Sequence, residues 1–390
     1  MAFNVFIHFL LLGLTSFGGP MAHIGFFRER FVQQQAWFSE AMFAQWVVLC
    51  NLLPGPSSSQ LGILIGYQRA GWLGALAAFI GFTLPSALIM LVLAYGVMQW
   101  QGAIEAWLPA LMVLAAAIVI QATWGMAKQF CRHTTTLAMT FISAITLVLV
   151  PSPLIAIGLL VLNGLIGWRV FQSSAAASPS NETLFNQQPS RAQARLLIGL
   201  ALGLLVVLPL VALFGGVWSL FDSLYRAGAL VWGGGHVVLP YLQLEFVQNQ
   251  QMDNALFLSG YAMAQALPGP MFSFAAYLGA LDQGLLGALV AVIAIFLAGL
   301  LLVIGILPFY QQLQSYPSIK AAMMGLQATV VGMMLGALIN PILPHSLTDG
   351  LTLSLLLFNL FWLFYLKRNL LGLIPINLAW IYLATLALSV

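Results

Sequence analysis

The chain of 390 residues is 62% hydrophobic and only 5% charged, whereas soluble domains carry about 25% charged residues. This composition excludes a soluble globular protein and predicts an all-α polytopic membrane protein. The small excess of 12 Lys+Arg over 9 Asp+Glu is interpreted as a signal of membrane orientation rather than of nucleic-acid binding. The two cysteines, Cys50 and Cys131, supply neither a disulfide framework nor a CxxC metal site.

Hydrophobic runs of membrane length fall into two groups. Six lie at roughly 3–18, 39–67, 71–98, 106–127, 135–150 and 153–170. The first has no basic segment before it, which favours a membrane element over a cleaved signal peptide. Seven more lie at roughly 195–215, 217–233, 253–280, 284–308, 317–342, 347–366 and 371–389. A polar stretch separates the groups, so we expect a first transporter repeat at 1–171, a cytoplasmic linker at 172–194 and a second repeat at 195–390.

The motif Leu-Pro-Gly-Pro occurs at 53–56 and again at 267–270, each time inside a hydrophobic run. Proline lacks a backbone N–H and clashes with the preceding turn, so each motif is expected to break a membrane helix. Broken backbone at membrane depth is tolerated where it is buried in protein or lines a cavity. Matching breaks in two halves therefore predict the binding site of a transporter. The candidates for substrate contact here are Pro54, Gly55, Pro56, Pro268, Gly269 and Pro270.

Three segments of the first half recur in the second half in the same order. Residues 17–32 match 232–247 at an offset of 215, the Leu-Pro-Gly-Pro motifs match at 214, and 71–76 match 284–289 at 213. This pattern indicates an internal duplication. If all thirteen runs span, seven crossings separate equivalent points, and an odd number makes the two repeats inverted.

Basic residues other than Arg226 divide nine to two between the predicted sides of the membrane. The bias places the N-terminus and the linker in the cytoplasm and the C-terminus outside. The larger group is Arg69, Lys128, Arg132, Arg169, Arg191, Arg195, Lys320, Lys367 and Arg368, and the smaller is Arg28 and Arg30.

Polar residues near the glycine pair and the first break are candidates for anion binding. Gly18 and Gly19 allow close backbone approach, which would let His23 and Arg28 face an anion; the alternative is a solvated outer loop in which arginine pairs with Glu29. Ser57 and Gln60 follow the first break, where free N–H groups and hydroxyls at a helix start suit an anion. The alternative for these serines is simple N-capping.

The second half offers a different set of charged groups. Arg226 lies inside an apolar run, where an arginine is a functional-site hypothesis; the alternative is snorkelling, with Asp222 as a partner. Gly233 and Gly234 match the first glycine pair. We expect Glu245, His236 and, in the first half, Glu29 to be candidates for proton coupling, with ordinary loop residues as the alternative. The motifs HExxH, Walker A and GxSxG are absent, so no enzyme, metal or cofactor is predicted.

These motifs resemble the chromate ion transporter family. The resemblance rests on the run from Thr15 to Arg28, both Leu-Pro-Gly-Pro motifs, Arg226 with Gly228, and Pro240, and it spans almost the whole chain. Trp232 stands where the family would place phenylalanine. The resemblance implies a multi-pass exporter of the bacterial inner membrane that gives chromate resistance, extends to sulfate and has two inverted halves.

The expected function is therefore secondary active export of chromate or a related oxyanion, driven by the membrane potential and coupled to protons. A dianion leaving a negative cytoplasm gains roughly 4.6 kcal/mol per 100 mV. The expected partners are the oxyanion, protons and the lipid bilayer, without nucleic acid, and the sequence leaves a homodimer open. The alternatives are transport of another anion, such as sulfate or an organic acid, and an anion channel.

Overall fold

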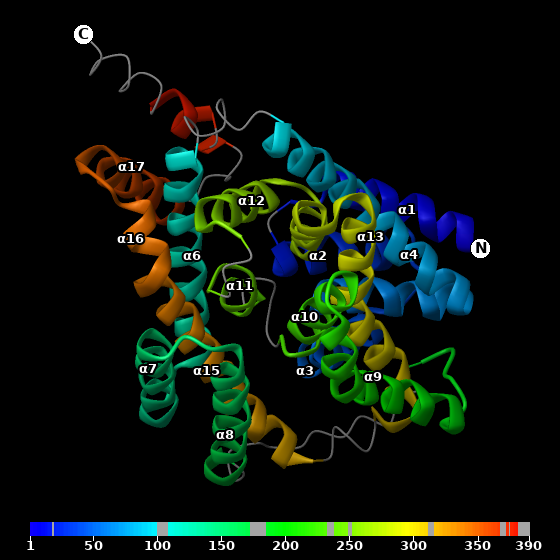
Figure 1. Ribbon diagram of the computed structural model, residues 1–390. Coiled ribbons are helices and arrows are strands. Elements are labelled where there is room, and N and C mark those ends of the chain that lie inside the picture. Colours follow the sequence, from blue (N-terminus) through cyan, green and yellow to red (C-terminus); the bar gives the residue numbers. More distant parts are fainter. Residues whose placement is uncertain are drawn as a thin grey trace.

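The computed structural model describes residues 1–17, 19–99, 108–171, 185–231, 238–248, 252–310, 316–366, 372–373 and 375–380. Helices make up nearly all of these residues (Figure 1). Gly18, Gly233, Gly234 and His236 lie outside the described residues, as do 172–184 of the predicted linker and most of the last hydrophobic run.

The described helices follow the predicted runs closely in order. Those of the first half are α1 (Ala2–Thr15), α2 (Gly19–Arg28), a π-helical turn η1 (Glu29–Gln34), α3 (Glu40–Leu52), α4 (Ser57–Gln99), α6 (Leu108–Phe130), α7 (Thr134–Leu149) and α8 (Pro153–Phe171). Those of the second half are α9 (Arg191–Val211), η3 (Ala212–Phe214), α10 (Val217–Ala229), α11 (Val238–Gln243), η5 (Leu244–Gln248), α12 (Asn254–Ala266), η6 (Met271–Ser273), α13 (Phe274–Gly305), η7 (Leu307–Phe309), α15 (Pro317–Ala337), η8 (Leu338–Ile342), α16 (Leu343–Ser346), α17 (Gly350–Leu360) and η9 (Phe361–Tyr365).

Six of the described helical segments are long and apolar enough to cross a membrane, which fits a polytopic membrane protein. They are Ser57–Gln99, Leu108–Phe130, Pro153–Phe171, Arg191–Phe214, Met271–Gly305 and Ser318–Ser346. Four more apolar helices are shorter, at Ala2–Thr15, Thr134–Leu149, Val238–Val247 and Gly350–Tyr365.

The chain turns back on itself at the second Leu-Pro-Gly-Pro motif. The Tyr277 hydroxyl donates to the carbonyl of Leu256 at 3.1 Å, and the rings of Phe257 and Phe274 lie 5.3 Å apart. The helix α12 and the first arm of α13 therefore lie side by side as a helical hairpin. Each arm has about 13 residues, or roughly 20 Å, which is shorter than the hydrocarbon core of about 30 Å.

The first motif produces the same reversal. The guanidinium of Arg69, at the end of the first arm of α4, lies 4.8 Å from the ring of Trp37, just before α3 begins. The condition that all thirteen runs span is therefore not met, because 39–67 and 253–280 are hairpins rather than crossings. Proline and glycine end the helical hydrogen-bonding pattern over four residues, and that is enough chain for a reversal.

Arg30 and Arg69 lie at the same end of the molecule. Arg30 Nε donates to His8 Nδ1 at 3.1 Å, and the His8 ring lies 5.3 Å from that of Trp37, against which Arg69 packs. The prediction that Arg28 and Arg30 face the opposite side from Arg69 is therefore wrong. It failed because the hairpin over α3 and the first arm of α4 had been counted as one crossing.

Each hairpin joins its crossing helix through a tight glycine turn. Ala70 and Gly71 have φ/ψ of −146/29° and 61/−149°, and Gln283 and Gly284 have −130/21° and 63/−147°. The helices on either side touch through backbone, since a Cβ at Gly66 would lie 2.2 Å from the Gly74 carbonyl oxygen. The equivalent distance from Gly279 to the Gly287 oxygen is 2.3 Å.

The crossing helices pack through small residues and interhelical hydrogen bonds, as is usual in membranes. Asn163 on α8 donates to Thr329 on α15 at 2.8 Å and to Ser143 on α7 at 3.1 Å. The end of the predicted linker is held against α4: Gln68 Oε1 accepts from the Asn186 and Gln187 amides, at 2.8 and 3.0 Å.

The glycine contacts generate a stability prediction. Gly66→Val should destabilise the protein by about 1–3 kcal/mol, because the new side chain must displace backbone. The midpoint of thermal unfolding of the purified protein measures this. Gly96→Val is the matched control, because a Cβ at Gly96 meets nothing within 4 Å. Equal midpoints for the two variants would contradict the tight packing of the hairpin.

Candidate functional site

The two breaks are held by backbone of the opposite half. The Gly55 amide donates to the Val231 carbonyl at 2.7 Å, and the Gly269 amide donates to the Ser16 carbonyl at 2.9 Å. Ser16 and Val231 end the helices α1 and α10, just before the two glycine-rich segments. Each break thus satisfies a backbone N–H that lipid cannot satisfy, and each lies against the residue that follows α1 or α10 of the opposite half.

Glycine is required at the centre of each break. Gly55 has φ +125° and Gly269 has φ +95°, values that side chains disfavour. A Cβ at Gly55 would lie 2.7 Å from Gln60 Nε2 and 3.0 Å from Gly299 Cα. A Cβ at Gly269 would lie 2.9 Å from Ser86 Oγ. The break and its surroundings are therefore in close contact on both sides.

The first break opens into a buried polar turn. Ser57, Ser58, Ser59 and Gln60 are all at most 5% exposed at the start of α4. Gln60 Nε2 donates to the Pro54 carbonyl at 2.8 Å and to the Gly299 carbonyl of the other half at 3.3 Å. Before the break, Ser39 caps α3 by accepting a hydrogen bond from the Met42 amide at 3.2 Å.

His23 joins this polar turn from α2. It is 1% exposed, its Nδ1 lies 3.3 Å from Ser58 Oγ, and its ring meets Phe82 edge-on at 5.2 Å. The structure thus brings His23 to the first break, as the sequence led us to expect.

Five polar atoms around this turn are buried and have no hydrogen-bond partner among the described residues. They are Ser16 Oγ, His23 Nε2, Ser59 Oγ, Gln60 Oε1 and Thr83 Oγ1. Buried polar groups are almost always satisfied, so this set fits a site that holds water or a polar ligand. Ser16, Ser59 and Thr83 were not singled out from the sequence, because hydroxyls in apolar runs carry no motif of their own.

The second break has an apolar surround instead. Met271, Phe272 and Phe274, which replace the serines and glutamine, are 2–6% exposed. Ser273 is the polar exception. The polarity of the site is therefore concentrated in the first half, next to Pro54, Gly55 and Pro56 rather than next to Pro268 and Pro270.

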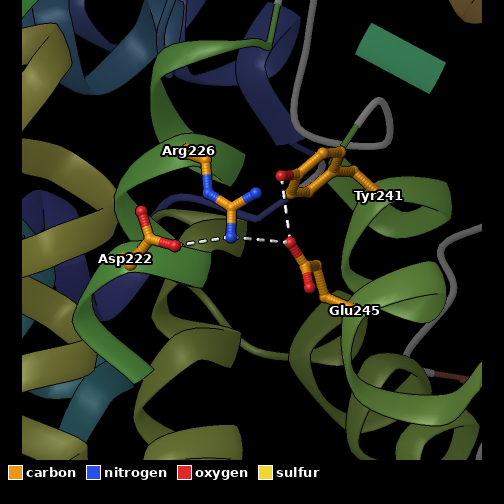
Figure 2. A network of polar contacts seen from close by, with 4 residues as sticks. All are labelled: Asp222, Arg226, Tyr241 and Glu245. Carbon is orange, nitrogen blue, oxygen red and sulfur yellow. Dashed lines mark hydrogen bonds and ion pairs between the residues drawn. The ribbon is translucent and has the colours of Figure 1, made fainter. Parts of the chain in front are cut away.

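The second half contributes a buried ion network instead, shown in Figure 2. Arg226 Nη2 lies 2.5 Å from Asp222 Oδ2 and 3.2 Å from Glu245 Oε1. The Tyr241 hydroxyl donates to the same Glu245 oxygen at 3.1 Å. Asp222 and Glu245 are 2% and 6% exposed. Arg226 therefore does not snorkel freely to the interface, because two carboxylates hold it.

Sequence reasoning missed Tyr241 in this network. It lies four residues before Glu245, the spacing that puts two side chains on one helical face. That spacing was the available signal. In the same region, Gln243 at the end of α11 donates to Asn254 at the start of α12, at 3.0 Å, and so links the two helices.

Arg28 and Glu29 are not brought to the buried turn. Arg28 forms an ion pair with Glu40, with half of each side chain exposed. Glu29 accepts from Gln34 at 3.1 Å. Two open pockets of about 420 and 260 Å³ lie along this face of α2 and η1, and Glu29 lines both. His23 is thus separated from Arg28, which lies on another face of the same helix.

Comparisons with known proteins agree on one class. The family model described as chromate transporter matches residues 3–168 and 218–388. An uncharacterized transporter of Methanocaldococcus jannaschii is 28% identical over 98% of this chain and 94% of its own length. A chromate transport protein of Cupriavidus metallidurans is 27% identical over 85% of this chain and 80% of its own length. A chromate transport protein of Pseudomonas aeruginosa is 25% identical, with 85% and 78% covered. No solved structure matches the chain significantly.

The break geometry generates a second prediction. Gly55→Ala and Gly269→Ala should each lower the free energy of unfolding by about 1–3 kcal/mol, through strain at positive φ and contact with the opposite half. Gly215→Ala is the control: Gly215 also has positive φ, +72°, but faces open space. The thermal unfolding midpoints of the three variants test this prediction. A loss in Gly215→Ala as large as in the other two would mean that backbone strain alone is responsible.

Proposed function

Because the chain belongs to the chromate transporter family, whose members are transporters and not enzymes, we propose that it is a secondary transporter that exports chromate from the cytoplasm. The observation that carries the proposal is the set of buried, unpartnered polar atoms beside the first break, in a chain that matches this family over most of its length. Export fits the energetics, since a dianion leaving a negative cytoplasm gains roughly 4.6 kcal/mol per 100 mV.

The proposed oxyanion site lies at the first break. Hydroxyls of Ser57 and its neighbours, His23, and the free N–H groups at the start of α4 supply the donors that a buried anion needs. The second break closes the site through the Gly269–Ser16 bond. Arg28, at the exposed end of α2, is proposed to attract the anion rather than to bind it.

Sulfate is the proposed second substrate, since it has the same charge and tetrahedral shape. Uptake of labelled chromate into inverted membrane vesicles tests the function, with sulfate as competitor. Saturation and acceleration by anion loaded on the opposite side support a carrier over a channel. Competition by sulfate separates a general oxyanion carrier from a chromate-selective one.

We further propose that the two halves are inverted repeats. The support is local: the turns at Gly71 and Gly284 have nearly the same dihedral angles, π-helical turns follow α2 and α11 at the same offset, and the family matches two segments. The segments α1 and α2–η1, and α10 and α11–η5, are paired in the same way, through Arg30 with His8 and Arg226 with Glu245, so we count them as hairpins too. With all four hairpins left out, five helical segments separate equivalent points: the second arm of α4, α6, α7, α8 and α9. Five is odd, as seven was, so the inversion persists.

The proposed orientation places the N-terminus and the linker in the cytoplasm and the C-terminus outside, in the inner membrane of a bacterium. In this orientation Arg28 and Arg30 are assigned to the same side of the membrane as Arg69. Every basic residue except Arg226 then falls on the cytoplasmic side, which is the pattern that the positive-inside rule favours.

Labelling of single cysteines tests this topology. In a background with Cys50 and Cys131 replaced, Gln35→Cys should react with a membrane-impermeant thiol reagent from the cytoplasmic side only, because the hairpin returns the chain there. Gln187→Cys and Gln283→Cys are the cytoplasmic and external controls. Labelling of Gln35→Cys from outside would restore the scheme in which α3 and the first arm of α4 cross the membrane.

Site variants test the substrate contact. Ser57→Ala and Ser59→Ala should raise the apparent KM for chromate about tenfold or more in vesicles, since a lost hydrogen bond from a hydroxyl to a charged group is worth about 1.5–3 kcal/mol. Ser354→Ala is the control, because Ser354 is exposed and bonds only its own helix. An unchanged KM in both site variants would move the anion site away from the first break.

A further inference from the structure

The ion network around Arg226 has more negative than positive charge. Asp222 and Glu245 are two carboxylates, and Arg226 is the one cation in contact with them among the described residues. With all three ionised the network carries one net negative charge in a buried position. Such charge is expensive inside a membrane protein, and one proton removes it.

The two carboxylates hold Arg226 in different ways. Asp222 lies one turn before Arg226 on α10, so this pair remains within one helix. Glu245 comes from η5, across the hairpin, and Tyr241 on α11 holds it in place. The Glu245 contact therefore closes the gap between the two hairpin arms, and it can open without disturbing the Asp222 pair.

Arg226 keeps hydrogen-bonding capacity beyond these two contacts. Both carboxylates converge on Nη2 (Figure 2), while the buried Nε–H has no partner in the part of the chain that the structure describes. A guanidinium can bind an oxyanion through two parallel N–H groups. Glu245 occupies the position on Nη2 that such an anion needs.

Described residues of two neighbouring elements act on Glu245. Arg226 and Asp222 act from α10 and Tyr241 from α11. The helix α12 also packs against η5; there Tyr261 bonds Gln265 and Asp253 caps the helix through the Ala255 amide. An incoming dianion would therefore meet two carboxylates and one cation, and repulsion would oppose binding unless one carboxylate were neutralised.

Building on the proposed oxyanion export, we propose that the anion replaces Glu245 on Arg226 and that Glu245 takes up one proton as it leaves. The proton comes from the aqueous phase facing the site and is released on the other side when Glu245 returns to Arg226. One proton thus travels with each dianion, and the exported charge is one negative unit instead of two. Asp222 is the positioning residue that keeps Arg226 in place.

Reconstituted protein with sulfate as substrate tests this, since sulfate stays a dianion across neutral pH. A sulfate gradient should drive protons in the same direction in wild-type vesicles, one per anion, read with a trapped pH dye. Glu245→Gln should still carry sulfate but move no protons, and the charge moved per anion should double. Proton flow opposite to sulfate, no proton flow in the wild type, or unchanged coupling in Glu245→Gln would each overturn the inference.

If Glu245→Gln inserts too poorly into vesicles for flux measurements, a binding measurement in detergent tests the same inference. Sulfate-induced thermal stabilisation in detergent gives an apparent affinity, which should weaken up to tenfold per pH unit in the wild type on the alkaline side, where binding takes up a proton. It should be independent of pH in Glu245→Gln. Asp222→Asn, in which Glu245 can still take up a proton, should bind more weakly but keep a pH dependence. Loss of all sulfate and chromate flux in the wild type would instead overturn the proposed function, and this inference with it.

Discussion

The fold depends on one constraint: a backbone amide within a membrane needs a partner. Each Pro-Gly-Pro segment leaves a backbone amide without a helical partner. Two hydrogen bonds satisfy these amides, from Gly55 to the Val231 carbonyl and from Gly269 to the Ser16 carbonyl. These bonds require both breaks to meet the ends of α1 and α10. The hairpins, the glycine turns behind them and the polar surround of the first break all follow from bringing these four positions together.

The two halves use this common framework differently. In the first half the break leads into serines, Gln60 and His23, which offer hydrogen bonds without formal charge. In the second half the same position is apolar, and the charged groups are displaced to the hairpin of α10, α11 and η5. Under the two proposals, the neutral donors of the first half suit a desolvated anion, and Arg226 in the second half receives the anion as Glu245 takes up a proton.

Much of the fold was predictable from the sequence. Helix order followed from hydrophobic runs, and both breaks followed from proline chemistry. The reversal at each break was not predictable, because a run such as 39–67 has the same length and composition whether it crosses the membrane or folds back. The deciding information was a contact between Trp37 and Arg69, and no local pattern encodes a contact over that separation. Among the buried polar residues described above, sequence motifs marked Gln60 and Glu245 as candidates, and no motif marked Thr83 or Tyr241.

The two bonds that hold the breaks against the opposite half involve main-chain atoms only. Ser16 and Val231 have nothing in common as side chains, yet each offers the same carbonyl to the opposite break. Substitution at either position therefore leaves the acceptor in place. On the proposal that the halves are repeats, such a junction tolerates divergence of the surrounding side chains, so that one half can be polar at its break and the other can carry an ion network without loss of assembly.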